Sequence, residues 1–312
     1  MNNSNTVSLY TSGSIAVAIF TSIVYIAVSS LLIGFKTDQL LLVFIFNVCY
    51  FFNEQSRKFI IGFSIFISFW IIFDFMKAFP NYQFSGVHIA DLYNAEKSVF
   101  GIALNGGIVT PNEYWLNKPS VFLYILSGIF YLCWIPVPLA FAFYLFLKDK
   151  KLFLHFSLTF VLVNLIGFII YYVYPAAPPW YFQLHGGTFI EGTPGNTAGL
   201  IKFDQYTGLS IFKNIYAKSS NVFAAMPSLH SAYPLIVLYY AFKINVNNFL
   251  KIALSIVAVG IWFAAVYTSH HYVLDVIAGI VCTIIGIIIF KKVLLTAVWF
   301  QRFINRFFLT IV

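Results

Sequence analysis

Three polar side chains in the C-terminal half of the sequence have types that could carry out acid–base or nucleophilic chemistry. His271 and Asp275 lie four residues apart, and His230 precedes His271 by 41 positions. Residues i and i+4 lie on one face of an α-helix, so a helix here would place the Asp275 carboxylate beside the His271 imidazole. Ionisable groups at the end of an apolar segment cost stability, which favours a functional explanation.

These residue types suit phosphoryl transfer. A carboxylate that accepts a hydrogen bond from one ring nitrogen of His271 fixes the tautomer and leaves the other nitrogen as a nucleophile or base. His230 can then act as a separate acid or base that protonates a leaving alkoxide. Two histidines and an aspartate could also ligate zinc or iron, but no third His or acid lies at ligand spacing. We therefore expect His230, His271 and Asp275 to be catalytic, with no metal and no cofactor.

The composition predicts an all-α, polytopic membrane protein. Of 312 residues, 61% are hydrophobic and 9% are charged, and the apolar residues form long segments. The net charge of +8 does not indicate nucleic-acid binding, because the basic residues lie in short loops and near the C-terminus. The three cysteines, Cys49, Cys133 and Cys282, fall in apolar segments and are expected to be small core residues.

Eight apolar segments divide a chain that we treat as a single domain, 1–312. They are 13–34, 40–52, 59–75, 121–146, 152–174, 228–242, 250–269 and 273–290. Segment 40–52 is short, and could be a tilted span, a re-entrant piece or an interfacial helix. Segment 228–242 is also short unless it begins near Val222. In the tail, 293–312, Arg302 and Arg306 lie one turn apart among aromatic residues, which predicts a helix at the membrane surface.

The connections 76–120 and 175–220 are long and rich in Gly, Pro, Asn and Tyr, and loops of this length usually carry function. If all eight segments span, eleven of the eighteen basic residues lie in short stretches on one side: Arg57, Lys58, Lys148, Lys150, Lys151, Lys243, Lys251, Lys291, Lys292, Arg302 and Arg306. The positive-inside rule makes that side cytoplasmic and places both long connections, with the three catalytic candidates, on the other side. We expect this to be a bacterial periplasm rather than a Golgi lumen.

Residues 227–230 read PSLH and residues 271–275 read HYVLD, which resembles two signatures of the type 2 phosphatidic acid phosphatase superfamily. One branch matches further, because 174–181 (YPAAPPWY), 199–200 (GL), 203–204 (FD), 208–209 (GL), 222–231 (VFAAMPSLHS) and 268–272 (TSHHY) look like the inositol phosphorylceramide synthases. The resemblance covers about 121–279 and is weaker over 76–120.

This resemblance implies a six-helix core over 59–290, preceded by one or two extra helices within 1–58. It implies that His271 attacks phosphorus, that Asp275 orients His271, and that His230 handles the leaving or entering hydroxyl. The implied reaction moves a phospho-head group, inositol phosphate from phosphatidylinositol, to ceramide and releases diacylglycerol without a metal. The implied partners are therefore these two lipids and the membrane itself.

The chain departs from the phosphatases of that superfamily at their basic residues. Ala265 stands where an Arg precedes the nucleophilic His by six residues, Ala177 stands in place of a first-signature Arg, and Ala264 replaces a Ser. Those cations bind a dianionic phosphomonoester, so their absence suits a singly charged phosphodiester. The Ser228–His230 amides at a helix N-terminus are our candidates for binding the phosphoryl oxygens.

Residues that could bind the substrate head group come from the same segments. Polar or aromatic side chains near the catalytic candidates make up this set: Ser228, Trp180, Tyr181, Asp204, Asn221 and His270. The remaining histidines, His88, His155 and His185, are expected to be structural.

Two other functions stay open at this point. A membrane lipid phosphatase acting on phosphatidate or an isoprenyl diphosphate is the alternative enzyme, and the missing cations argue against it. A transporter or channel would use intramembrane ionisable residues, but Asp74 is the only other acid deep in an apolar segment and no inverted repeat is visible.

Overall fold

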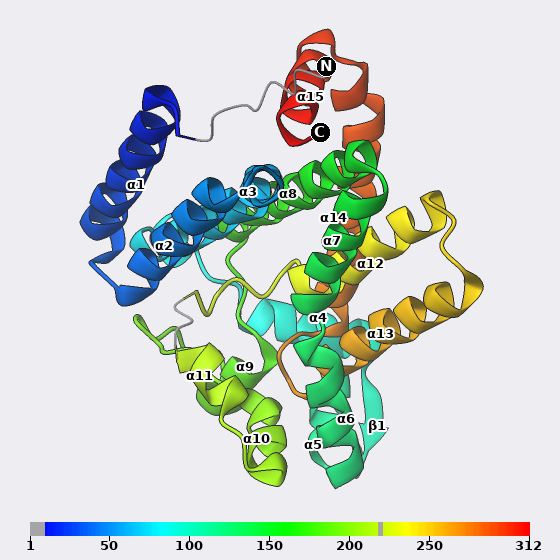
Figure 1. The fold of residues 1–312 in the computed structure, drawn as a ribbon. Helices are drawn as coiled ribbons and strands as arrows, with labels where there is room; N and C mark the ends of the chain where they lie inside the picture. The colour runs from blue at the N-terminus through cyan, green and yellow to red at the C-terminus, as the bar shows by residue number, and fades with distance from the viewer. Residues whose placement is uncertain (1–9, 218–220) are drawn as a thin grey trace, which may run out of the picture.

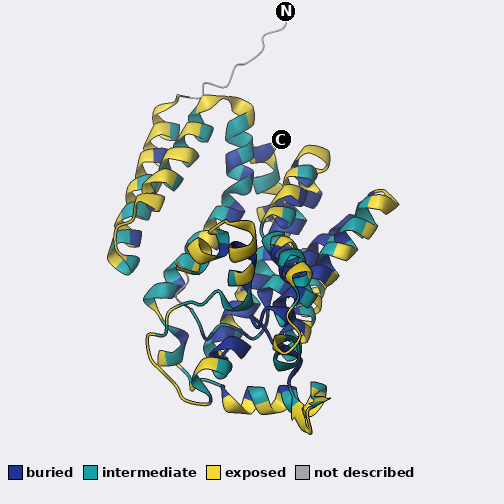
Figure 2. Ribbon diagram, turned by 90° about the horizontal axis from the view of Figure 1, so that it is seen from below, coloured by how far each residue is buried: buried dark blue, intermediate teal, exposed yellow. Residues whose placement is uncertain are grey.

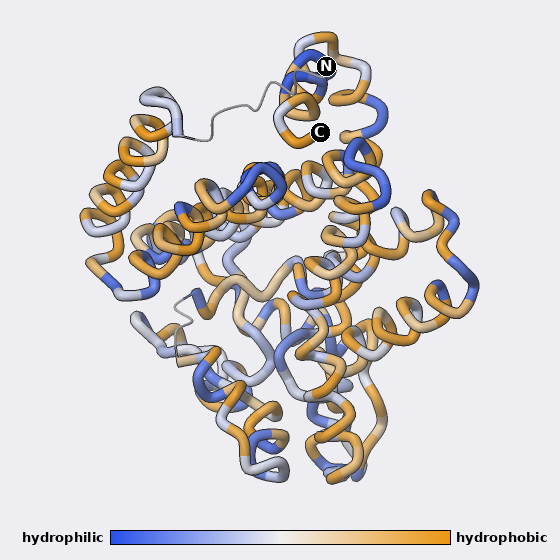
Figure 3. The backbone as a smooth tube through the Cα atoms, in the orientation of Figure 1, coloured by the Kyte–Doolittle hydropathy of each residue, from blue (hydrophilic) through white to orange (hydrophobic). Residues whose placement is uncertain are grey.

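The computed structural model describes residues 10–217 and 221–312, and most of this part is helical (Figure 1). The bundle is formed by α1 (Ser12–Ile33), α2 (Thr37–Phe52), α3 (Glu54–Phe75), α6 (Val121–Leu132), α7 (Pro136–Lys148), α8 (Lys150–Val173), α12 (Leu229–Lys243), α13 (Asn248–Tyr267) and α14 (Val273–Lys292). The remaining α-helices are α4 (Ala90–Phe100), α5 (Pro111–Leu116), α9 (Pro179–His185), α10 (Ile201–Thr207), α11 (Ile211–Ala217) and α15 (Val298–Ile311). Apolar residues dominate the long helices, and many of the polar residues lie in the connections (Figure 3).

Helix α8 forms the core of the bundle and packs against α3, α7, α12 and α14. Asp149 is the N-cap residue of this helix, because its side chain accepts a hydrogen bond from the Leu152 amide at 2.9 Å. Phe153, Phe156 and Val163 are fully buried along it. Burial is concentrated at this centre, whereas the N-terminal helices are largely exposed (Figure 2). Exposed apolar faces on such helices are what a lipid environment covers.

Six stretches in the described part of the chain are long and apolar enough to cross a membrane: Ser12–Ile33, Glu54–Ala78, Val121–Lys148, Lys150–Val173, Asn248–Tyr267 and Val273–Thr296. The predicted fold class, an all-α polytopic membrane protein, is confirmed.

The segment expected at 121–146 is two helices rather than one. Helix α6 ends at Leu132 and α7 begins at Pro136. Proline has no amide hydrogen to donate into a preceding turn, but it fits the first turn of a new helix. The break lies beside the site described below, and it turns Trp134 toward it.

Helix α12 is only 15 residues long, because it begins at Leu229 and not near Val222. Its length therefore keeps it outside the six candidate spans, although it packs against α7, α8, α13 and α14 within the bundle. Ser228 is the N-cap residue of α12, since its side chain accepts a hydrogen bond from the Ser231 amide at 3.4 Å. Because this short helix starts inside the bundle, its first turn, which carries His230, also lies inside the bundle.

The extra N-terminal helices form two successive hairpins, in which α1 contacts α2 and α2 packs along α3. Gly34, at φ 76°, lies in the first turn, where a left-handed backbone favours glycine. Asn53 forms the second turn, where its side chain accepts a hydrogen bond from the Ser56 amide at 2.8 Å. The ambiguous segment 40–52 is therefore the body of a 16-residue helix, α2.

The two long connections are folded structures. The first contains α4, α5 and a hairpin of β1 (Ile102–Leu104) and β2 (Gly107–Val109), which adds a small antiparallel sheet to the predicted all-α fold. Asn105 and Gly106 both have positive φ in its two-residue turn, as Asn-Gly turns require. The second contains α9, α10 and α11. A bridge between His88 and Ala176 joins the two connections.

The C-terminal tail forms α15, which packs against α3 and α8. The Lys150 Nζ donates a hydrogen bond to the Ile311 carbonyl at 2.6 Å, and this contact holds the end of α15 at the start of α8. Arg302 and Arg306 are exposed. An amphipathic helix with exposed cations suits the surface position that we predicted, which stays a prediction.

Candidate active site

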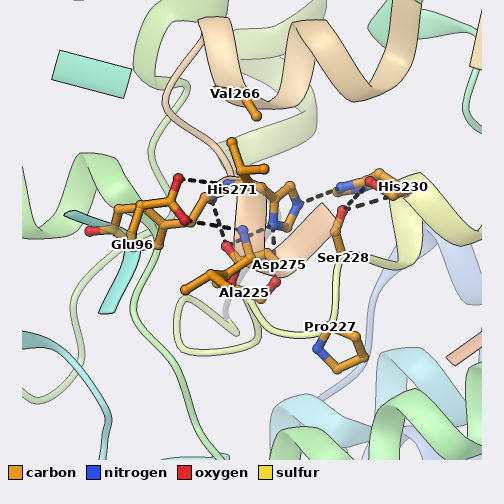
Figure 4. A network of polar contacts seen from close by, with 12 residues as sticks. Glu96, Ala225, Pro227, Ser228, His230, Val266, His271 and Asp275 are labelled. Atoms are coloured by element: carbon orange, nitrogen blue, oxygen red, sulfur yellow. Dashed lines mark hydrogen bonds and ion pairs between the residues drawn. The ribbon is translucent and has the colours of Figure 1, made fainter. Parts of the chain in front are cut away.

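The three catalytic candidates meet where α12 and α14 begin (Figure 4). His230 is the second residue of α12, and its Nδ1 lies 3.0 Å from Nε2 of His271. His271 lies in the turn before α14, and its Nδ1 is 3.6 Å from Oδ2 of Asp275. Both His271 and Asp275 are buried, at 6% and 0% exposure. Residues 41 positions apart therefore form one continuous polar chain.

The surroundings of His271 fix its tautomer. Nδ1 lies 3.0 Å from the Ala225 carbonyl, which can only accept a hydrogen bond. Nδ1 therefore carries the hydrogen, and Nε2 of the neutral ring holds the lone pair that faces His230. This is the arrangement that a nucleophilic histidine needs.

Asp275 supports His271 less directly than we expected. Its 3.6 Å separation from Nδ1 is longer than a hydrogen bond, so the Ala225 carbonyl makes the closer contact. Its Oδ2 accepts a hydrogen bond from the Tyr272 amide at 2.8 Å, which caps α14. Oδ1 is buried with no partner among the described residues. Asp275 therefore contributes mainly a fixed negative charge beside the imidazole.

Two aromatic side chains hold His230. The Tyr131 hydroxyl of α6 lies 2.9 Å from His230 Nδ1, and the Trp134 ring meets the imidazole edge-on at a centroid distance of 4.5 Å. Tyr131 is 1% exposed, and its hydroxyl also pairs with that of Tyr216 in α11. No sequence pattern singled out Tyr131, which lies 99 positions from His230.

Ser228 joins the two catalytic helices. Its amide donates a hydrogen bond to the Asp275 carbonyl at 2.9 Å. That amide is therefore already engaged and is not free to bind a phosphoryl oxygen, contrary to our expectation for it. Gly279 makes this approach possible, because a Cβ there would lie 2.2 Å from the Ser228 carbonyl oxygen. The close contact sets the separation of α12 and α14.

His270 stacks between two tyrosines, with ring centroids 5.4 Å from Tyr131 and 4.7 Å from Tyr216. Its Nε2 donates a hydrogen bond to the Thr197 carbonyl at 2.9 Å. Burial, together with the neighbouring His271, lowers the pKa of His270 to about 3. The ring is therefore neutral near pH 7, and Nδ1 is an acceptor that could receive a hydroxyl hydrogen.

The other predicted substrate-binding residues are mostly engaged within the 175–220 connection. The Asp204 carboxylate accepts hydrogen bonds from the Phe212 and Lys213 amides at 3.2 and 2.8 Å, so it caps α11. The Tyr181 hydroxyl donates to the Thr188 carbonyl at 3.0 Å and accepts from the Ile190 amide at 2.8 Å.

Trp180 and Asn221, the other two predicted substrate-binding residues, differ from Asp204 and Tyr181 in their contacts. The Trp180 amide donates to the Ser269 carbonyl at 3.1 Å, beside the catalytic turn, and the Trp180 side chain is 5% exposed. The buried Nδ2 of Asn221 has no partner among the described residues. Trp180 therefore anchors the connection to the site, and no described residue occupies the Asn221 donor.

Two residues of the 76–120 connection also support the site, and sequence reasoning missed both. Glu96 of α4 accepts hydrogen bonds from the Val273 and Leu274 amides at 2.9 and 3.1 Å (Figure 4). Nδ2 of Asn112 donates to the Val266 and His271 carbonyls at 2.8 and 2.9 Å. Their partners lie more than 150 positions away, so spacing carried no signal.

The described contacts of the three catalytic candidates include no Lys or Arg side chain. No Lys or Arg within the described ranges takes part in the contacts of His230, His271 or Asp275 given above. Within the same ranges, no three His, Cys, Asp or Glu side chains converge so that they could hold a metal ion. The available donors are therefore neutral hydroxyl, imidazole and amide groups.

Comparison with known proteins relates this geometry to a family. A sequence profile of the PAP2 superfamily matches residues 101–289, which include all three catalytic candidates. The chain is 41% identical over 285 residues to the phosphoinositol dihydroceramide synthase of Bacteroides thetaiotaomicron, covering 91% of this chain and 93% of that protein.

Fungal proteins match over shorter stretches. The inositol phosphorylceramide synthase of Candida albicans is 32% identical over 180 residues, which are 53% of this chain and 37% of that protein. The catalytic subunit of the Saccharomyces cerevisiae synthase is 33% identical over 134 residues, or 41% of this chain and 31% of that protein. No solved structure was found to match.

Proposed function

Because this chain belongs to the PAP2 superfamily and aligns over nearly its whole length with a phosphoinositol dihydroceramide synthase, we propose that it transfers inositol phosphate from phosphatidylinositol to a ceramide and releases diacylglycerol. The observation that carries this proposal is the contact between His230 Nδ1 and His271 Nε2 at 3.0 Å, with Nδ1 of His271 already committed to the Ala225 carbonyl.

In the first step, Nε2 of His271 attacks the phosphorus of the donor lipid. A bond forms between Nε2 and phosphorus, and the bond from phosphorus to the diacylglycerol oxygen breaks. The anionic phosphodiester favours the protonated form of His230. The leaving alkoxide takes up the proton of this imidazolium, so diacylglycerol departs neutral and His230 becomes neutral. The Asp275 carboxylate beside Nδ1 stabilises the positive charge that develops on His271.

In the second step, the ceramide hydroxyl attacks the same phosphorus. His230, which lost its proton in the first step, now accepts the hydroxyl proton. The nitrogen–phosphorus bond breaks, and His271 returns to its neutral form. Each transfer therefore restores both histidines, and no water is consumed.

The two imidazoles must separate before phosphorus can enter. Nε2 of His271 points at His230 Nδ1 from 3.0 Å, the distance of a direct hydrogen bond. A phosphoryl group attacked by Nε2 needs that space. His230 lies in the first turn of the short helix α12. A small rotation of its side chain would admit the group and keep His230 beside the leaving oxygen.

The absence of cations among the site contacts favours a phosphodiester substrate over a phosphomonoester. A dianionic monoester would need charge-assisted hydrogen bonds from Lys or Arg to offset its desolvation. A diester carries a single charge, which neutral donors such as the Tyr131 hydroxyl can satisfy more easily. A phosphodiester donor supports the transferase over the phosphatase alternative.

We also propose that the site faces the periplasm of a bacterial inner membrane. The bacterial relative and the placement of lysines at the opposite ends of α12 and α14 support this orientation. The positive-inside rule makes those lysine-bearing ends cytoplasmic.

The reaction can be tested with purified protein in lipid nanodiscs. Phosphatidylinositol and ceramide should yield diacylglycerol and inositol phosphorylceramide in equal amounts, detected by mass spectrometry, and His271→Ala should abolish both products. Release of inorganic phosphate from phosphatidate, with ceramide untouched, would instead establish the lipid phosphatase.

A further inference from the structure

Glu96 is a buried carboxylate outside the catalytic group, and it contacts α14, the helix that carries Asp275. Its side chain is 0% exposed, and its two oxygens accept hydrogen bonds from the Val273 and Leu274 amides (Figure 4). The next residue of that helix is Asp275, whose own carboxylate accepts the Tyr272 amide. Two carboxylates from distant parts of the chain thus bind three successive amides at one helix end.

Capping the N-terminus of α14 does not by itself require two carboxylates. One carboxylate near a helix N-terminus is stabilised by the unpaired amides and the helix dipole. A second, fully buried carboxylate is costly, because burial opposes its ionisation and the Asp275 charge repels it. Burial raises the pKa of Glu96 to about 7, with Asp275 adding to the rise and the two amides opposing it. A costly feature that contacts a catalytic helix suggests a catalytic benefit.

We infer that Glu96 is a positioning residue, which holds the first turn of α14 so that Asp275 and His271 keep their geometry. This inference rests on the proposed function. Glu96 precedes residue 101, where the match to the superfamily profile begins, so it lies outside the matched range. Its position on α4 makes the 76–120 connection a clamp over the catalytic turn.

Asn112 strengthens this clamp from a second point. It is 0% exposed, and its Nδ2 holds the carbonyl of His271 itself as well as that of Val266. Glu96 therefore fixes the amides after the catalytic turn, and Asn112 fixes a carbonyl within it. Both residues act through the backbone and neither touches the phosphorus.

The test compares Glu96→Gln with Glu191→Gln, a matched change of an exposed glutamate. Glu96→Gln keeps the size of the side chain but turns an amide group toward a backbone donor. We expect kcat to fall about 10- to 100-fold with KM changed less than about threefold, since small misplacement of reacting groups costs rates of this order. Glu96→Asp should have less than half of the wild-type kcat. Glu191→Gln should have the wild-type kcat.

Equal kcat values for Glu96→Gln and wild type would overturn the inference. A loss of kcat that merely follows a loss of folded protein, measured by size-exclusion recovery and melting temperature, would also overturn it. Failure of the proposed function has a different signature, because the wild type itself would then form no inositol phosphorylceramide.

A second inference comes from a separate surface. An open groove of about 830 Å³, which we call the furrow, follows α12 and α14 toward their C-terminal ends. Its walls are apolar side chains one helical turn apart, and two lysines close one end: Leu235, Leu238, Tyr239, Phe242, Lys243, Ile280, Ile284, Ile287, Ile288 and Lys291. The residues from 280 to 291 extend about 16 Å at the helical rise.

The two lysines lie close enough to repel each other electrostatically. Lys243 Nζ lies 5.5 Å from the centre of the Tyr240 ring, and Lys291 Nζ lies 5.8 Å from that of Tyr239. Neither ammonium forms an ion pair with a carboxylate in the described part of the chain. Asp149 does interact with Lys243 at longer range. Paired cations at the end of an apolar furrow are complementary to an anionic phospholipid.

We propose that this furrow binds an anionic phospholipid, with an acyl chain along α12 and α14 and the phosphate at Lys243 and Lys291. The lysines end the helices whose first turns hold His230 and Asp275, about 20 Å away at the helical rise. The lipid site is therefore separate from the catalytic site.

This site can be tested by thermal-shift titration of the purified protein with phosphatidylglycerol and, in parallel, phosphatidylcholine. The double variant Lys243→Ala/Lys291→Ala should bind phosphatidylglycerol at least tenfold more weakly than the wild type. Ile284→Trp, which fills the furrow and leaves both lysines in place, should weaken binding similarly. Lys292→Ala removes an adjacent exposed charge outside the furrow and should bind within twofold of the wild type.

Two outcomes would exclude the lipid site. One is equal stabilisation of the wild type by phosphatidylglycerol and phosphatidylcholine. The other is equal weakening by Lys292→Ala and the double variant, which would mean that the effect is general surface charge.

Discussion

For individual residues, the backbone carbonyl of Ala225 changes the role expected for Asp275. In hydrolytic triads, the carboxylate both fixes the tautomer of the histidine and stabilises its charge. Here the carbonyl lies 3.0 Å from Nδ1 of His271, and the carboxylate lies 3.6 Å away. The two duties are therefore divided, and a substitution of Asp275 removes only the electrostatic one.

Asp275→Asn should lower kcat by about 100-fold, which is less than the loss of several orders of magnitude expected for His271→Ala. The charge beside the imidazolium is lost, but the Ala225 carbonyl still keeps the hydrogen on Nδ1. Steady-state kinetics of both variants provide the comparison. Equal losses would show that the carbonyl does not fix the tautomer.

Tyr131→Phe should lower kcat about 10- to 100-fold. A hydrogen bond to a group that becomes charged contributes about 1.5–3 kcal/mol, and the hydroxyl lies 2.9 Å from His230 Nδ1. The phenylalanine ring preserves the buried packing, so folding should be little affected. Tyr124→Phe, a buried tyrosine on the same helix outside the contacts of His230, serves as the control and should retain full kcat.

The titration of Glu96 predicts how stability depends on pH. Its pKa in the folded protein is about 7, above the ordinary value of 4.5. The folded protein therefore keeps a proton that the unfolded chain has lost, and Glu96 stabilises the fold at low pH. This contribution is present below pH 4.5 and is lost as the pH rises through 7.

Glutamine has no titratable group, so the Glu96→Gln variant lacks this pH-dependent contribution to stability. Its melting temperature should therefore rise relative to that of the wild type between pH 5 and pH 8, in nanodiscs followed by intrinsic fluorescence. A difference that stays constant over this range would mean that Glu96 does not titrate there. Asp275 is the other carboxylate at this helix end, and both proteins retain it.

Among the helices, the sequence predicted most of the long segments and missed how their ends are arranged. The apolar runs predicted the spans, because hydropathy over about 20 residues reports burial in lipid directly. The i, i+4 argument placed His271 and Asp275 correctly side by side, although His271 precedes α14 rather than lying on its face. Contacts of Tyr131, Glu96 and Asn112 with the site depend on tertiary packing, which no local pattern encodes.

Gly279→Ala tests whether the contact of α12 with α14 sets the catalytic geometry. The added Cβ would lie 2.2 Å from the Ser228 carbonyl oxygen, and a backbone atom in a packed helix cannot move aside cheaply. We expect a loss of about 1–3 kcal/mol in the free energy of unfolding and a loss of most activity. Gly13→Ala, which meets no neighbouring atom, should change neither quantity.

For the molecule as a whole, the charges, the catalytic turn and the two long connections define a direction across the membrane. The connections join each other through His88 and Ala176 and cover the end of the bundle where α12 and α14 begin. Lys243, Lys291 and Lys292 lie at the opposite ends of those helices. The proposed exofacial site therefore requires the β1–β2 hairpin and Lys292 to lie on opposite sides.

Single cysteines can report this orientation. With Cys49, Cys133 and Cys282 replaced by alanine, Asn105→Cys places a thiol at the hairpin turn and Lys292→Cys places one at the end of α14. A membrane-impermeant maleimide should label the first in intact spheroplasts, and the second only after permeabilisation, because the positive-inside rule retains the lysine-rich side in the cytoplasm. The cysteine-free protein must keep its lipid-transfer activity for the assay to count. Labelling in the reverse order would place the catalytic turn in the cytoplasm, where the head group of phosphatidylinositol in the inner leaflet would be its substrate.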